Sequence, residues 1–177
     1  MNKIARARQR IGATIGERYR LLDVLGVGGT GAVYLAEHVV TEERFALKVL
    51  AKGFAESDPS AVERFVREAR AAAQIKHPGV VKVFDAASDA QTEELFLAME
   101  LLEGEELTAL LDRGHTSAAE VVRLVVEVLG ILAAVHERGI VHRDVKPSNV
   151  FIARTPDGRR TVKLLEFGVA RHTDQSK

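Results

Sequence analysis

The sequence contains no cysteine, and this absence excludes several kinds of structure and chemistry. Disulfide bridges, thiolate zinc sites and cysteine nucleophiles all need the missing side chain. A chain without cysteine suits a reducing compartment, and we expect a cytoplasmic protein. Neither sign of charge is in excess, because 25 lysine and arginine residues balance 25 aspartate and glutamate residues. Domains that bind nucleic acids usually carry a basic surplus, so we expect no nucleic-acid partner.

Long hydrophobic runs are missing as well. The most apolar stretch, residues 121–135, is interrupted by Arg123 and Glu127, and it is shorter than the ~20 residues that a helix needs to cross a bilayer. We therefore expect no membrane span. The basic residues near the N-terminus precede no apolar segment of the kind found in signal peptides. We interpret residues 1–14 as a basic, mobile tail, and we favour a solvated tail over an arm that binds phosphate or lipid.

At 177 residues the chain has the length of about one domain, and its pattern changes once along the sequence. The first part is rich in alternating and β-branched apolar residues, which are typical of strands. Strands are predicted at residues 19–25, 32–38, 44–50, 80–84 and 95–101. One helix is predicted from the N-cap Asp58, with Pro59 at its first position, to Lys76. This part is therefore expected to be a five-stranded antiparallel sheet with one helix.

After Gly104 the pattern favours helices. Residues 105–111 predict a short helix. Ser117 and Glu120 form a capping box, which predicts the start of a long apolar helix that ends at Gly139. Two short strands are predicted at 149–153 and 161–165, around a turn. The whole chain is thus expected to have an α+β fold.

Four glycines lie within the six residues Gly26-Val27-Gly28-Gly29-Thr30-Gly31, between two predicted strands. The backbone N–H groups of such a loop can approach phosphate oxygens, because no side chain intervenes. A dinucleotide-binding loop would be followed by a helix and, about 20 residues on, by an acidic residue. Here a strand follows and Ala46 stands near that position, so this interpretation fails. Taken alone, the loop is equally well explained as a flexible hairpin turn.

Several charged residues follow the glycine loop. Lys48 lies on a predicted strand, on the face opposite Phe45 and Leu47, and Glu68 lies within the predicted helix. Each of these two charges, taken alone, would be interpreted as solvated. In contrast, the acid, lysine and amide in Asp144-Val145-Lys146-Pro147-Ser148-Asn149 form a cluster that an arbitrary loop seldom carries.

Together and in this order, the motifs resemble the eukaryotic-type protein kinase family. The family pattern comprises the glycine loop, the strand lysine, the helix glutamate, His142-Arg143-Asp144 with Asn149, and Glu166-Phe167-Gly168 at the D-F-G position. The serine/threonine branch fits best, because Lys146-Pro147 follows Asp144, and the style is that of bacterial members. The resemblance covers about residues 16–173. It implies a kinase N-lobe and hinge at residues 15–101 and a partial, helical C-lobe at 102–177.

The resemblance also implies roles for individual residues. ATP and Mg²⁺ would be the cofactors, and an unidentified protein would be the substrate or partner. Asp144 would accept the proton of the substrate hydroxyl, Lys146 would contact the γ-phosphate, and the metal ligands would be Asn149 and Glu166. The residues that bind ATP would be Gly26, Gly28, Gly31, Val33, Ala46, Lys48, Glu68, Met99, Glu100, Leu102 and Phe151.

The chain departs from the family pattern at two places. Glu166 stands where the family has aspartate, and its extra methylene moves the carboxylate outward by about 1.5 Å. Because magnesium demands near-ideal octahedral geometry, nucleotide binding is expected to survive better than turnover. No A-P-E motif follows Gly168, so the C-lobe is expected to be incomplete. Three interpretations remain: a serine/threonine protein kinase domain with impaired activity, a pseudokinase-like module that binds nucleotide or a partner protein, and an incomplete kinase fragment.

Overall fold

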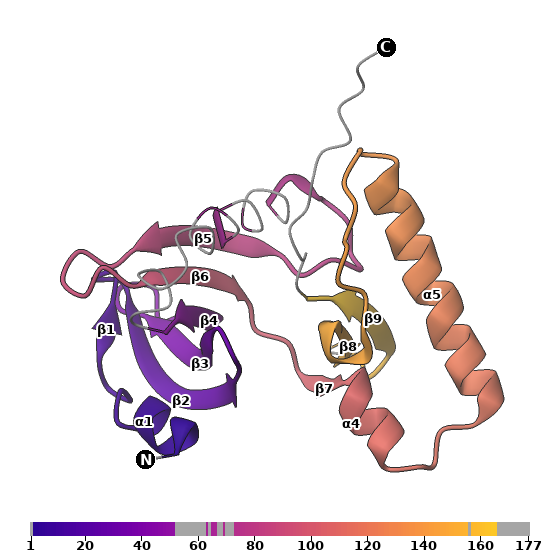
Figure 1. The fold of residues 1–177 in the computed structure, drawn as a ribbon, viewed down its shortest axis with the longest axis horizontal. Coiled ribbons are helices and arrows are strands. Elements are labelled where there is room, and N and C mark those ends of the chain that lie inside the picture. Colours follow the sequence, from indigo (N-terminus) through magenta and orange to yellow (C-terminus); the bar gives the residue numbers. More distant parts are fainter. Residues whose placement is uncertain are drawn as a thin grey trace. The chain divides into compact units, whose positions relative to one another are not determined.

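The computed structural model describes residues 2–51, 63, 65–66, 69, 73–155 and 157–165. The chain divides into two compact units. The N-unit comprises Met1–Ala69 and Val83–Leu101, and the C-unit comprises Arg70–Lys82 and Leu102–Lys177. Figure 1 shows that strands dominate the N-unit and that the C-unit contains the longest helix. The expected α+β fold is confirmed.

An antiparallel sheet of six strands forms the N-unit, in the order β1-β2-β3-β4-β6-β5. The strands are β1 (Thr14–Ile15), β2 (Tyr19–Val27), β3 (Gly31–His38), β4 (Arg44–Leu50), β5 (Val83–Ser88) and β6 (Leu95–Glu100). Four of the five expected strands correspond to β2, β3, β4 and β6. Alternation along the chain therefore located most of the sheet.

The sequence pattern missed β1, because the turn after it uses an unusual backbone conformation. Ile15 in β1 pairs with Tyr19 in β2. Between them Gly16 and Glu17 have positive φ angles of 58° and 59°. Two adjacent positive φ angles suit a tight hairpin, but glutamate seldom adopts one. The Gly16 N–H also donates to Asp89 Oδ2 at 2.6 Å, which holds the turn in place. The sheet consequently has six strands rather than five.

The strand expected at 80–84 is shifted along the chain. The observed strand β5 begins at Val83, and the two valines before it belong to the C-unit. Val80 forms a parallel bridge with Leu164, and the Val81 N–H donates to the Leu164 carbonyl at 2.9 Å. A short apolar run suits either pairing, so the periodicity could not separate the two arrangements.

One face of the N-unit sheet carries its core. The core consists of buried side chains from five strands and the N-terminal segment: Ala7, Ile15, Tyr19, Leu21, Tyr34, Ala36, Phe45, Leu47, Val49, Phe96 and Ala98. The Tyr19 ring packs edge-on against Phe45 and Phe96, with ring centroids 5.6 and 5.8 Å apart. Such pairs add about 0.5–1.5 kcal/mol to the stabilisation from burial alone. This core leaves the opposite face of the sheet for other contacts.

The N-terminal segment differs from the mobile tail that the sequence led us to expect. Residues Lys3–Arg8 form helix α1, whose N-cap Asn2 accepts a hydrogen bond from the Ile4 N–H at 3.2 Å. Ala7 is buried in the core. Arg10 donates two hydrogen bonds to the carboxylate of Glu94, at 3.1 and 2.5 Å. The Gly12 N–H donates to the Leu21 carbonyl and the Leu21 N–H donates to the Ala13 carbonyl, so backbone bonds to β2 also hold the segment. None of these contacts gives a clear signal in the sequence.

The helix expected between Asp58 and Lys76 lies mostly outside the described residues. Asp58, Pro59 and Glu68 are among those not described. Within this range Phe65 and Ala69 are helical and buried, as the expected apolar face requires.

The C-unit combines a three-stranded antiparallel sheet with helices (Figure 1). Its elements are β7 (Gly104–Glu106), α4 (Leu107–Asp112), α5 (Ala118–His136), the 3₁₀ helix η1 (Pro147–Asn149), β8 (Val150–Arg154) and β9 (Arg160–Leu164). Gly104 has a φ of 143°, and a Cβ there would lie 2.1 Å from the Ile152 carbonyl oxygen. The close pairing of β7 with β8 therefore requires glycine at this position.

Helix α5 begins where the capping box predicts. The Ser117 hydroxyl accepts a hydrogen bond from the Glu120 N–H at 3.2 Å. One face of the helix is buried through Leu124, Val128, Ile131 and Val135. Another face leaves large apolar side chains exposed, namely Val122, Val125, Val126 and Leu129. Among the described residues, no helix is long and apolar enough to cross a membrane.

Candidate functional site

The glycine-rich segment forms the turn between β2 and β3. The Gly28 N–H donates to the Gly31 carbonyl at 2.8 Å, which closes the turn. A Cβ at Gly31 would lie 2.1 Å from the Val49 carbonyl oxygen, so a side chain there would push β3 away from β4. A Cβ at Gly26 would meet nothing within 4 Å. Packing therefore explains Gly31, and the glycine at position 26 needs another reason.

Four of the expected binding residues share one face of the N-unit sheet. Val33 in β3 lies opposite Lys48 in β4, and Ala46 in β4 lies opposite Met99 in β6. Side chains directly opposite each other in neighbouring strands point to the same face, as do side chains two positions apart in one strand. All four side chains consequently lie on the face opposite the core. We call this surface the Lys48 face.

Two further residues on the Lys48 face were not among the expected ones. Leu35 lies opposite Ala46, and Leu97 lies opposite Lys48. Strand alternation could have identified both, because they stand two positions from Val33 and Met99. They extend the Lys48 face into an apolar surface around one ammonium group.

Lys48 is buried, with 8% of its surface exposed. A buried ammonium group needs a partner, because desolvation disfavours its charged form. The family resemblance assigns this role to Glu68, which lies outside the described residues, and so the ion pair stays a prediction. Glu100 lies opposite Phe45 and points to the core side of the sheet, so any contact that it makes with a ligand on the Lys48 face is through its backbone.

In the C-unit the three expected catalytic-loop residues lie together. The Lys146 Nζ donates to Asp144 Oδ2 at 2.7 Å, and the Asn149 Nδ2 donates to the same oxygen at 2.9 Å. Asn149 also donates to the Asp144 carbonyl at 2.9 Å. Pro147 starts η1 with a fixed φ, and this short turn carries Asn149 back to Asp144. The cluster is thus built by local bonds within six residues.

The surroundings of Asp144 keep it ionised. The hydrogen bond from Lys146 lowers the pKa of the carboxyl group most, burial opposes this, and the bond from Asn149 adds to the lowering. Both donors bind Oδ2, and no described residue donates to Oδ1. The side chain remains 42% exposed. The Asp144 N–H donates to Nδ1 of the buried His142 at 3.3 Å, and this bond holds the backbone of the loop at Asp144.

The other expected residues of the C-unit are less closely tied to this cluster. Phe151 is half-buried in β8, where it lies between Glu106 of β7 and Lys163 of β9. Leu102 precedes β7 outside any strand. Glu166 lies outside the described residues, but the chain leading to it is anchored, because the Leu165 N–H donates to the Asn149 carbonyl at 3.0 Å.

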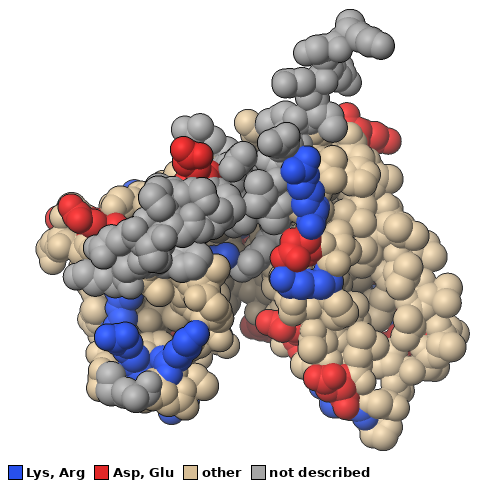
Figure 2. Space-filling view, in the orientation of Figure 1, with Lys and Arg blue, Asp and Glu red and all other residues tan. Residues whose placement is uncertain are grey.

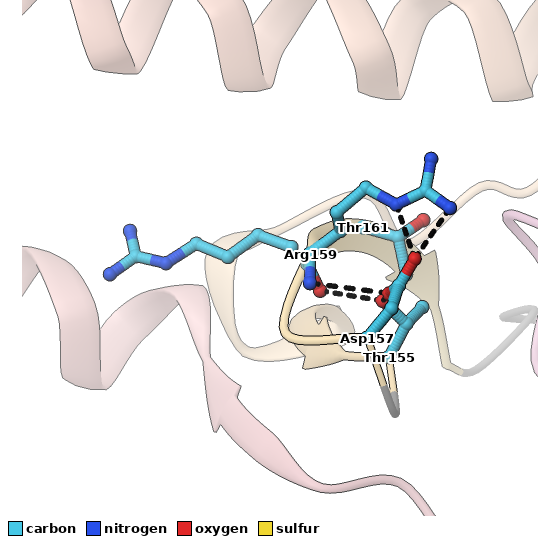
Figure 3. Close-up of a pocket in the computed structure, with 5 residues that line it drawn as sticks. Thr155, Asp157, Arg159 and Thr161 are labelled. Atoms are coloured by element: carbon cyan, nitrogen blue, oxygen red, sulfur yellow. Dashed lines mark hydrogen bonds and ion pairs between the residues drawn. The ribbon is translucent and has the colours of Figure 1, made fainter.

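A second group of polar side chains lines a cavity of about 510 Å³ at the β8–β9 turn (Figure 3). Asp157 accepts hydrogen bonds from the Thr155 hydroxyl and from Arg159 Nε, and these bonds lower the pKa of its carboxyl group. Figure 3 shows these side chains turned toward one another across the turn. Because they bond among themselves, we interpret them as residues that hold the turn.

Comparison with known proteins agrees with this geometry. Residues 19–177 match the family model described as the protein kinase domain. The serine/threonine-protein kinase Pkn1 of Myxococcus xanthus is 43% identical over 156 residues, which cover 88% of this chain and 22% of that protein. For the serine/threonine-protein kinase PknA of Mycobacterium tuberculosis the identity is 39%, over 93% of this chain and 38% of that protein. The solved structure of the M. tuberculosis PknI kinase domain has a TM-score of 0.74 at 32% identity, covering 90% of this chain and 61% of that chain.

The fold, the Lys48 face and the Asp144 cluster define a protein kinase domain, and the chain belongs to that family. Within the family it is of the bacterial serine/threonine type, as its relatives are. The resemblance stated from the sequence is therefore confirmed. The chain spans less than two thirds of the length of these relatives.

Proposed function

We propose that the chain binds ATP with magnesium and transfers the terminal phosphoryl group to a serine or threonine hydroxyl of a protein. The observation that carries this proposal is that Lys146 and Asn149 both bind Oδ2 of Asp144, and no described residue donates to Oδ1. Lys146 and Asn149 hold the other carboxylate oxygen, so the side chain has one orientation and one open acceptor. An acceptor fixed in this way can align a hydroxyl for in-line attack, and alignment is a large part of phosphoryl-transfer catalysis.

In this proposal the N-unit binds the nucleotide. The apolar part of the Lys48 face, with Val33, Ala46 and Met99, would contact the adenine ring, and Phe151 of the C-unit would add to it. The backbone at Glu100 and Leu102 would bond the base, and the ammonium group of Lys48 would bind phosphate oxygens. The open space at Gly26 suits this role, because it keeps the backbone of the loop accessible to phosphates.

The lowered pKa of Asp144 decides how this residue would act. A carboxylate with a low pKa is a weak base, so it would first accept a hydrogen bond from the hydroxyl and take the proton late in the transfer. Lys146 would donate to the γ-phosphate during this step. Its bond to Oδ2 would then weaken, and the pKa of Asp144 would rise as the proton arrives.

Magnesium, when bound, would neutralise phosphate charge. Its preferred ligands are oxygens. The Asn149 amide uses Nδ2 for both bonds to Asp144, which directs its Oδ1 toward other partners. Asn149 therefore fits the role of a ligand. The family resemblance assigns the second protein ligand to Glu166, which lies outside the described residues.

Glu166 favours a second candidate function, that of a pseudokinase-like module which binds nucleotide or a partner protein and turns over slowly. Its extra methylene relative to aspartate would displace one metal ligand. A displacement of about 1 Å can cost on the order of 10²-fold in rate.

Phosphoryl transfer from labelled ATP to a generic protein substrate tests the proposal. Asp144→Asn should lower the rate by roughly 10²–10⁴-fold. Asp112→Asn, which changes an exposed aspartate at the end of α4, is the matched control and should leave the rate unchanged. ATP with magnesium at 100 times Kd should raise the Tm of both variants by roughly 5–11 °C.

The outcomes separate the candidates. A rise in Tm without turnover, which Glu166→Asp converts to turnover, would support the binding module with an impaired metal site. No rise in Tm with ATP and magnesium would contradict the kinase proposal and nucleotide binding by the second candidate, and would leave only binding of a partner protein.

A further inference from the structure

Besides the cavity at the β8–β9 turn, the chain has a second cavity, which lies in the N-unit beside α1 and has a volume of about 560 Å³. Its lining comes from α1, the glycine turn, β3, the end of β4 and the β5–β6 turn, and includes Lys3, Arg6, Arg10, Tyr34, Val49 and Glu94. Cavities of this size bind small molecules in many proteins. Among its lining residues, Tyr34 and Val49 lie on the core side of the sheet, and Gly31 and Leu50 pair at the end of β3 and β4 next to the glycine turn.

Positive charge dominates the lining of this cavity. Three basic residues, Lys3, Arg6 and Arg10, face a single acid, Glu94. Arg10 already neutralises Glu94 through two hydrogen bonds. Lys3 and Arg6 form no ion pair in the part of the chain that the structure describes. Figure 2 shows basic side chains gathered over α1, at the lower left of the view. Two cations of the lining, Lys3 and Arg6, are thus without an acidic partner among the described residues.

The rest of the lining is mainly apolar. Tyr34 and Val49 are buried to within 1% exposure, and Leu50 and Ala7 to within 5%. Arg10 lies above the Tyr34 ring, 6.0 Å from its centroid, so the Arg10–Glu94 pair closes one side of the cavity. A ligand in this cavity would therefore meet cations at one end and apolar walls elsewhere.

We propose that this cavity binds a small amphipathic anion: one carboxylate, sulfonate or phosphate group on an apolar body. Lys3 and Arg6 contact the acidic group, and the side chains of β3 and β4 contact the apolar body. The mobile tail expected from the sequence is, in this proposal, the cationic wall of a ligand site. Neither Lys48 nor Asp144 lines the cavity, although Gly28 and Gly31, two of the residues expected to bind ATP, do.

The test uses 1-anilinonaphthalene-8-sulfonate, a fluorescent sulfonate with an apolar aromatic body, titrated into the 177-residue chain. We expect saturable binding to one site. Lys3→Ala combined with Arg6→Ala should weaken binding about tenfold, because two ion pairs are lost. Arg8→Ala is the matched control: Arg8 lies on the same helix and is exposed, but does not line the cavity, so binding should change less than about twofold.

Two more variants distinguish binding in the cavity from binding elsewhere on the chain. Ala32→Leu fills the cavity without changing charge and should also weaken binding, provided that its thermal unfolding stays cooperative. Leu129→Ser removes part of the exposed apolar face of α5, where the probe could bind instead, and should leave the affinity unchanged. The proposal is overturned if the Lys3/Arg6 double variant binds as tightly as the wild type, or if only Leu129→Ser weakens binding.

Discussion

In the N-unit the residues of the Lys48 face come from three strands, and only strand pairing brings them together, whereas in the C-unit Asp144, Lys146 and Asn149 lie within six positions. A shift of one residue in the pairing of β3 with β4 would turn Val33 away from Lys48. No such shift can separate Asn149 from Asp144, because the turn between them is local. The first group therefore depends on the whole sheet, and the second on one short loop.

The two units also differ in how completely they bury apolar surface. The core face of the N-unit sheet is covered by its own aromatic side chains and by α1. In the C-unit, helix α5 buries one face, but Val126 and Leu129 on another face remain 61% and 58% exposed. Exposed apolar patches usually mark a surface that takes part in further contacts.

The largest expected effect tests this difference in burial. Phe96→Ala removes a fully buried ring from the N-unit core and should lower the free energy of unfolding by about 3–5 kcal/mol. Leu129→Ala removes an exposed side chain from α5 and should change it by less than about 0.5 kcal/mol. Urea unfolding of both variants measures the contrast. Equal losses would show that the outer face of α5 is buried in solution.

A smaller effect is expected in the glycine turn, where packing distinguishes two glycines. Gly31→Ala forces a Cβ against the Val49 carbonyl and should cost about 1–3 kcal/mol through displacement of β3 from β4. Gly26→Ala places its Cβ in open space and should stay within about 0.5 kcal/mol of the wild type. Thermal unfolding compares them, and a loss at Gly26 that matches the loss at Gly31 would contradict the difference in packing.

A still smaller effect concerns Tyr19 in the N-unit core. Its hydroxyl donates to Asp85 Oδ2 at 3.2 Å, and Tyr19→Phe should cost about 0.5–1.5 kcal/mol at neutral pH. Burial, with the nearby Asp85 carboxylate, raises the pKa of Tyr19 from 10.0 to about 12. A raised pKa stabilises the fold below pH 10, and this contribution is lost as the pH rises toward 12. The Tyr19→Phe variant should therefore lose less stability than the wild type in denaturant unfolding across that range.

The smallest expected effect is a shift in the pKa of Asp144. Lys146 is the main cause of the lowered pKa of Asp144, and Asn149 contributes less. The pKa of Asp144 should rise in Lys146→Met and rise less in Asn149→Ala, as followed by carbon NMR of the carboxyl group. Because the pKa of Asp144 is lowered in the folded chain, the ionised carboxylate stabilises the fold at neutral pH. This stabilisation is lost as the pH falls through the pKa of the folded state. An unchanged pKa in both variants would show that the loop bonds do not persist in solution.

Much of the fold could be predicted because the relevant signals are local. The alternation in β4 separates Phe45, Leu47 and Val49 from Ala46 and Lys48, as observed. The Ser117–Glu120 capping box marks the start of α5 within one residue. The sequence places the acid, lysine and amide of the Asp144 cluster within six residues, and their expected roles come from the family resemblance.

The parts that could not be predicted depend on contacts distant in sequence. The positive φ of Glu17 is favoured only because Asp89, far along the chain, holds the Gly16 N–H. Helix α1 is fixed by Arg10 bonding to Glu94 in another turn. Val80 pairs with Leu164 although its apolar neighbours suit the N-unit sheet equally well. None of these partners can be identified from periodicity.

The backbone around Leu164 has a consequence for amide hydrogen exchange. Leu164 donates to the Gly79 carbonyl and accepts from the Val81 N–H, and the next residue, Leu165, donates to the Asn149 carbonyl. The amides of Val81, Leu164 and Leu165 are thus protected by one set of interlocking bonds. Such sets open as cooperative units rather than one bond at a time. We therefore expect the Asp144–Asn149 segment, the end of β9 and the segment before β5 to form a single exchange unit, whose opening would release all three segments together.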